Sequence, residues 1–180
     1  MADYSPALQG RLLAVGATHA ELAMRDDIPT LGMLASAYGE ETPVEWLVIQ
    51  LGGISDFAEV KNKITSGQVY ELADMVLSAY YYLNAAEVLF FIGRFKMGCY
   101  GTFYGAIDPM KITSALMQYA VERRQDIERQ EREQDRLRRE RESQERAEGR
   151  VSYEEYMELK RRAAAGDEDA ARRLAQPNVG

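Results

Sequence analysis

Residues 84–97 read NAAEVLFFIGRFKM, and they decide the fold. Asn84 with Glu87 three residues later is a capping-box pattern, which predicts a helix over 85–97. The side chains that follow are apolar on nearly every face of this helix. A helix of that kind lies at the centre of a core, so we expect the other elements to pack around it.

Apolar residues at helical spacing continue toward the N-terminus. They predict one helix over 7–23 and another over 68–83, which would pair with the helix over 85–97 as a helical hairpin. Thr30 and Gly39 are typical of the residues that flank the start and the end of a short helix.

A further start signal lies between these helices. Thr42, Pro43 and Glu45 place a capping side chain, a proline at the first helical position and a glutamate at the third. We therefore expect a helix that begins here and ends at Gly52 and Gly53. Because β-strand signals are weak throughout, the chain is predicted to be all-α.

On the C-terminal side, Asp108 and Pro109 start a helix whose core spacing lasts to Ala120. From 122 to 150 the three apolar side chains stand ten residues apart. That spacing is not a heptad, so we reject a two-stranded coiled coil. Pairs of opposite charge at i,i+4, among them Glu142 with Arg146, predict a solvated single helix instead.

The chain is thus expected to have three parts. Residues 1–121 form a compact multi-helix domain that folds without the rest of the chain. Residues 122–150 form a long charged helix or spacer. Ser152 and Glu155 make another capping box, which opens a small helical hairpin over 151–180.

The formal net charge of −7 belongs to the N-terminal part of the chain. Residues 1–110 hold 6 Lys and Arg against 13 Asp and Glu, whereas residues 111–180 hold 16 of each kind. An acidic body repels nucleic acid at long range. Any contact with nucleic acid would therefore have to use a local basic patch.

The residues that carry catalysis or bind metals are sparse. One cysteine, Cys99, and one histidine, His19, exclude an internal disulfide and a Cys/His zinc cluster. The paired carboxylates lie at helix starts or in loops, where the helix macrodipole explains them. We therefore predict no catalytic residue, no metal and no cofactor, and we do not expect an enzyme.

The sequence also bears on location. The longest apolar run, residues 88–92, is far short of a membrane span of about 20 residues. The start of the chain lacks the basic and apolar regions of a signal peptide. We expect a cytoplasmic protein that makes no membrane contact.

Residues 94–111 contain the candidate functional residues. Three glycines, at 98, 101 and 105, alternate with aromatic residues and have basic neighbours. Such a composition suits contact with a partner or stacking on bases. It also suits an inter-helix loop that turns at its glycines and anchors its aromatic rings on the core. If the segment binds a partner, the contact residues are Arg94, Lys96, Tyr100, Phe103, Tyr104 and Lys111.

Six methionines follow the helical stripes. Methionine is flexible and fills irregular gaps between core side chains. We expect core filling, and neither a metal site nor a cofactor site, from Met24, Met33, Met75, Met97, Met110 and Met117.

The motif RFKxGxYGxFYGxxDP occupies residues 94–109 and follows a helix that ends in Tyr80-Tyr81-Tyr82-Leu83. With these residues the chain resembles, over 43–125, a family of uncharacterised small helical proteins from anaerobic bacteria and their mobile elements and phages. That family has no established activity. The resemblance therefore implies a genomic setting and transfers no catalytic residue.

These features favour a non-enzymatic adaptor or accessory protein in nucleic-acid metabolism, for example replication, of a mobile element or its host. The segment 98–107 would contact the partner, which we expect to be a protein, and the charged helix would serve as a spacer. A phage-encoded structural or assembly protein is the alternative, because an acidic helical body with a projecting helix would serve that role equally well.

Overall fold

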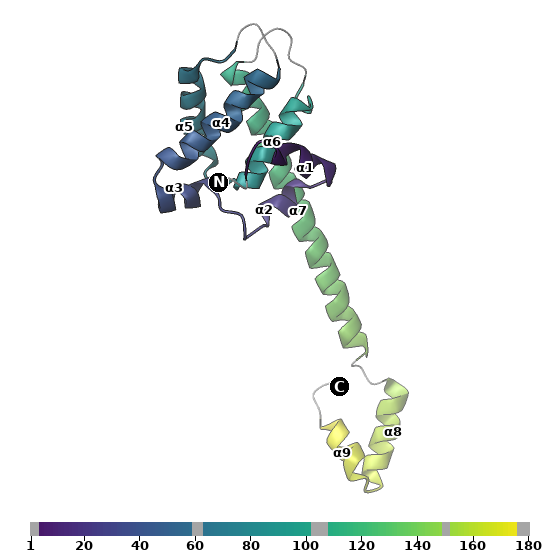
Figure 1. The fold of residues 1–180 in the computed structure, drawn as a ribbon. Helices are drawn as coiled ribbons and strands as arrows, with labels where there is room; N and C mark the ends of the chain where they lie inside the picture. Colours follow the sequence, from purple (N-terminus) through teal and green to yellow (C-terminus); the bar gives the residue numbers. More distant parts are fainter. Residues whose placement is uncertain (1–3, 59–62, 102–107, 149–151, 176–180) are drawn as a thin grey trace. The chain divides into compact units, whose positions relative to one another are not determined.

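A computed structural model describes residues 4–58, 63–101, 108–148 and 152–175. Over these residues the chain forms helices and no β-strand, which confirms the all-α class (Figure 1). The chain divides into two compact units, residues 1–130 and 131–180. The helices are α1 Leu8–Ala14, α2 His19–Ala23, α3 Leu31–Tyr38, α4 Glu41–Phe57, α5 Ser66–Tyr80, α6 Ala85–Lys96, α7 Pro109–Glu148, α8 Tyr153–Ala164 and α9 Glu168–Leu174.

Helix α6 is the central helix of the first unit, as predicted. The Asn84 side chain accepts a hydrogen bond from the Glu87 N–H, and the Glu87 carboxylate accepts one from the Asn84 N–H, each at 3.0 Å. Ten of the twelve residues of α6 are buried. The capping box thus starts a helix whose surface is covered by neighbouring elements on nearly all sides.

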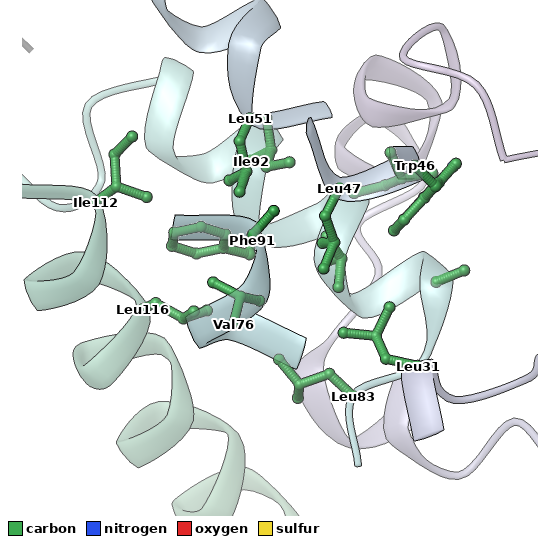
Figure 2. Packing of buried hydrophobic residues seen from close by; sticks show 14 of the residues in the cluster. Leu31, Trp46, Leu47, Leu51, Val76, Leu83, Phe91, Ile92, Ile112 and Leu116 are labelled. Carbon is green, nitrogen blue, oxygen red and sulfur yellow. The ribbon is translucent and has the colours of Figure 1, made fainter. Parts of the chain in front are cut away.

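The core forms where α4, α5 and α7 pack around α6. Phe91 of α6 is 1% exposed. Figure 2 shows it among side chains from the other three helices: Leu51 of α4, Val76 of α5, and Ile112 and Leu116 of α7. The first turns of α7 therefore belong to the core of the first unit.

The single helix predicted over 7–23 is wrong, because the chain turns between α1 and α2. Gly16 has a φ of +66°, a left-handed conformation that ends α1. Thr18 then caps α2: its hydroxyl oxygen accepts a hydrogen bond from the Glu21 N–H, and the Glu21 carboxylate accepts one from the Thr18 N–H. The turn places His19 at the first position of a new helix.

The predicted limits of the next helix are also wrong. Helix α4 begins at Glu41, and the Thr42 hydroxyl donates a hydrogen bond to the Tyr38 carbonyl instead of capping the helix. The helix continues through Gly52 and Gly53 to Phe57. Glycine inside a helix costs about 1 kcal/mol, and burial of apolar side chains on both sides of the pair, Leu51 and Ile54 among them, offsets that cost.

The charged part of the chain is helical, and the predicted solvated helix is confirmed for residues 131–146, whose side chains are all exposed. Glu142 and Arg146 form one of the predicted i,i+4 pairs, at 3.6 Å. Residues 122–130 of the same helix belong to the first compact unit, which therefore extends beyond Val121.

The second unit contains the predicted helical hairpin. The Ser152 side chain and Glu155 cap α8, and Asp167 caps α9. Gly166 makes the turn between the two helices with a φ of +97°. Leu159 and Ala170 are the buried residues of these helices, so the core of the hairpin is small.

Candidate partner-binding site

Arg94 lies in a polar network inside the first unit. Its Nε donates a hydrogen bond to the Tyr100 hydroxyl at 3.0 Å, and its terminal nitrogen donates one to Glu122 at 2.9 Å. The guanidinium also stacks 5.6 Å from the centre of the Tyr100 ring. The Arg94 side chain is 26% exposed. Arg94 thus connects α6, the following turn and α7 through hydrogen bonds within the protein.

Tyr100 anchors the segment that follows α6. Its ring packs 5.7 Å from that of Phe91, and burial raises the pKa of its hydroxyl to about 12. Gly98 and Gly101 on either side have φ angles of +79° and +102°, which glycine adopts without strain. For these residues the structure matches the interpretation of a loop that turns at glycines and packs an aromatic ring on the core.

Of the other candidate residues, Lys96 lies apart from Tyr100, whereas Lys111 lies near it. Lys96 donates a hydrogen bond to the Gln9 side chain at 3.0 Å, and burial lowers the pKa of its ammonium group. Lys111 lies in the first turn of α7 and lines a shallow groove of about 320 Å³ together with Tyr100, Asp108, Met110, Ser114, Ala115 and Gln118. Phe103 and Tyr104 lie outside the residues that the structure describes.

The methionines are not in the core, so the prediction of core filling is wrong. All six have exposed side chains, and the most exposed are Met97 at 72%, Met110 at 78% and Met117 at 63%. Met97 follows α6, whereas Met110 and Met117 are seven residues apart and lie on one face of α7. The buried positions of α7 include Ile112, Leu116 and Tyr119, so a helical wheel of α7 would have placed the methionines outside the core stripe.

Residues from the predicted spacer complete the polar network. His19 is 6% exposed; its Nδ1 donates to Asp126 at 2.8 Å, and its Nε2 lies 3.5 Å from Glu122. Burial acts to raise the pKa of Asp126, but the hydrogen bond from His19 and the charge of Arg129 outweigh it, so the pKa is lowered. His19 thus holds α2 against α7 over a sequence separation of 107 residues.

A second ion pair joins α6 to α7 deeper in the protein. Arg123 Nε lies 2.5 Å from the carboxylate of Glu87, whose side chain is 1% exposed. The same guanidinium stacks 5.2 Å from the centre of the Tyr82 ring. Sequence reasoning missed this pair, because Arg123 stands in a run of charged residues where most side chains are solvated.

The described residues contain no group of three or more His, Cys, Asp or Glu side chains that could hold a metal ion. No described helix is long and apolar enough to cross a membrane. Within the first unit, the carboxylates around His19 are occupied by cationic neighbours: Glu122 by Arg94, and Asp126 by Arg129.

His19 and Glu87 contact residues 122–126 of α7. These contacts predict how far a shortened chain must extend for the first unit to keep its stability. A chain ending at Gln130 keeps Glu122, Arg123 and Asp126, so it should unfold in one cooperative step at the denaturant concentration that unfolds the same unit in the full chain. A chain ending at Val121 loses all three side chains and should be the less stable of the two. Urea melts followed by circular dichroism check this. A molten 1–130 chain would show that the unit needs residues beyond Gln130.

Comparison with known proteins finds one family. The sequence profile of a family of unknown function, DUF6633, matches residues 63–166. The match includes α5, α6 and the motif over 94–109. Comparison with curated proteins finds no match. Comparison with solved structures finds none either.

Proposed function

This chain belongs to the DUF6633 family of unknown function, and we propose that it is a non-enzymatic adaptor that binds a protein partner. The contact surface consists of the exposed side chains of Met97, Met110 and Met117, which we name the methionine surface. In the sequence, Met97 and Met110 lie on either side of the segment 98–107, which the sequence indicates as a candidate contact.

One observation carries this proposal. Three large apolar side chains, each more than 60% exposed, stand at the end of α6 and on one face of α7. Isolated exposed apolar residues are common, but several near one another are typical of interaction sites. Methionine is frequent at such surfaces because its flexible side chain adapts to the shape of a partner.

A protein fits this surface better than a nucleic acid does. Phosphate contacts supply most of the affinity for nucleic acids, and they require accessible Lys and Arg side chains. Arg94 is paired with Glu122 and Tyr100, and Lys96 is hydrogen-bonded to Gln9. Contact of a phosphate with Arg94 or Lys96 would therefore break interactions that hold the first unit together.

The setting we propose is nucleic-acid metabolism, for example replication, of a mobile element or its host. The resemblance of the motif over 94–109 to proteins of anaerobic bacteria, mobile elements and phages supports it. A structural or assembly role in a phage is the second candidate, and the exposed charged helix over 131–146 favours it, since such a helix can space two bound components.

The test is capture of partners from the native host with the wild-type chain and with Met97→Ser/Met110→Ser/Met117→Ser. We expect mass spectrometry to find partner proteins that the wild type retains and the triple variant loses. Because the three side chains are exposed, the melting midpoint should not change. The matched control is Met33→Ser/Met75→Ser, which alters two exposed methionines on α3 and α5 and should retain the same partners.

Equal recovery by the wild type and the triple variant would overturn the methionine surface as the contact. The identity of the partners decides the setting. A helicase or primase supports the role in replication, whereas portal or capsid proteins support the assembly role.

A further inference from the structure

Helix α4 presents a second exposed face. Glu41, Glu45, Ile49 and Asp56 follow one another at intervals of four, four and seven residues, which places them on one side of the helix. All four are exposed, and Ile49 is 63% exposed although it is apolar. The opposite side of α4 packs on the core.

Helix α5 extends this face. The Ile64 N–H donates a hydrogen bond to the Ser55 hydroxyl at 3.5 Å, and α5 packs alongside α4 (Figure 1). On the exposed side of α5, Tyr70 is 54% exposed and is followed by the exposed Glu71 and Asp74. Two large apolar side chains, Ile49 and Tyr70, therefore stand on neighbouring helices.

The charge around them is strongly negative. The exposed carboxylates of the two helices are Glu41, Glu45, Asp56, Glu71 and Asp74. Over the described residues from 40 to 80, the one cation is Lys63, and it already pairs with Asp56 at 2.7 Å. The face therefore combines two exposed apolar side chains with four carboxylates, Glu41, Glu45, Glu71 and Asp74, for which the described residues show no ion pair.

We propose that this α4–α5 face binds a basic amphipathic helix of a partner protein. The apolar stripe of such a helix would cover Ile49 and Tyr70, and its Lys and Arg side chains would meet the four carboxylates that have no ion pair. A fixed negative field attracts a cationic partner and speeds its association. The same field repels nucleic acid and anionic lipid, so the chemistry selects a basic protein segment.

This inference does not depend on the proposed function. The methionine surface lies at the end of α6 and on α7, whereas the α4–α5 face lies on two other helices. A protein with both surfaces could bind two partners at once. Each surface can be altered while the other is left intact, so the two proposals can fail separately.

The probe is a fluorescent synthetic peptide of about 18 residues, or five helical turns, with Leu at helical spacing and Lys elsewhere. Anisotropy titrations of the full chain should show binding that weakens as salt is raised. A peptide with Glu in place of Lys should not bind. A peptide with the same composition but scrambled order, and hence no apolar stripe, should bind about tenfold more weakly, which corresponds to a modest loss of contact energy.

Variants locate the site. Ile49→Ser/Tyr70→Ser should raise the Kd at least about tenfold, and Glu45→Gln/Asp74→Asn should both raise it and flatten its salt dependence. All four side chains are exposed, so circular dichroism melts should match the wild type. The control Met110→Ser/Met117→Ser leaves the face intact and should bind the peptide normally. Unchanged affinity of Ile49→Ser/Tyr70→Ser, or equal binding of the scrambled peptide, would overturn the proposal.

Discussion

Phe91→Ala is expected to lower the free energy of unfolding of the first unit by about 3–5 kcal/mol, the usual cost of removing a buried aromatic ring. The Phe91 ring is 1% exposed and packs 5.6 Å from that of Tyr119 and 6.1 Å from that of Phe95. Its removal leaves a cavity among side chains from several helices, which cannot all move to fill it. Domains have stabilities of about 5–15 kcal/mol, so the variant should be close to unfolding.

Urea denaturation followed by tryptophan fluorescence measures this effect. The single tryptophan, Trp46, is 6% exposed, and its indole donates a hydrogen bond to the Tyr4 carbonyl, so its emission reports on the first unit. Phe57→Ala is the matched control: Phe57 is 62% exposed and should cost less than about 1 kcal/mol. A loss for Phe91→Ala as small as that of the control would mean that α6 is not the central helix.

Arg123→Ala is expected to cost about 3–5 kcal/mol, because it leaves the buried carboxylate of Glu87 without its charged partner. The Glu87 side chain is 1% exposed, and its other oxygen is bound by the Asn84 N–H. Water therefore has little access to the carboxylate once the guanidinium is gone. The truncation also removes the contact of Arg123 with the ring of Tyr82.

The neighbouring residue supplies the control for this variant. Arg124 has the same side chain in the same helix but is exposed, so Arg124→Ala should change the free energy of unfolding by less than about 0.5 kcal/mol. Adding Glu87→Gln to Arg123→Ala should recover part of the loss, because a neutral amide still accepts the hydrogen bond from the Asn84 N–H. Equal urea midpoints for Arg123→Ala and Arg124→Ala would contradict the structure.

The motif over 94–109 shows how far sequence reasoning reached at the candidate site. Its glycines indicated turns, and Gly98 and Gly101 have the positive φ angles that only glycine adopts easily. Its aromatic and basic residues left two interpretations open. In the structure the Tyr100 ring packs against the core beside Phe91, and Arg94 pairs with Glu122. Glu122 lies on α7, which only the fold brings to α6.

The methionines illustrate the same limit within single helices. Helical spacing shows that residues share a stripe, but it does not show which stripe faces the core. On α7, Leu116 and Met117 are adjacent apolar residues, yet the first is 2% exposed and the second 63%. The neighbouring helices determine this difference, and their positions depend on contacts distant in sequence.

The sequence by itself determined the all-α class, the central helix α6 and several helix starts. Asn84 with Glu87, and Ser152 with Glu155, cap helices through partners three residues apart, and such hydrogen bonds involve only residues close in sequence. Only the tertiary structure decided that α4 continues through Gly52 and Gly53, and that charged residues of α7 belong to the first unit. His19 and Asp126 are 107 residues apart, so no local pattern shows that they meet. Burial against helices distant in sequence outweighs local preferences, such as the tendency of a glycine pair to end a helix.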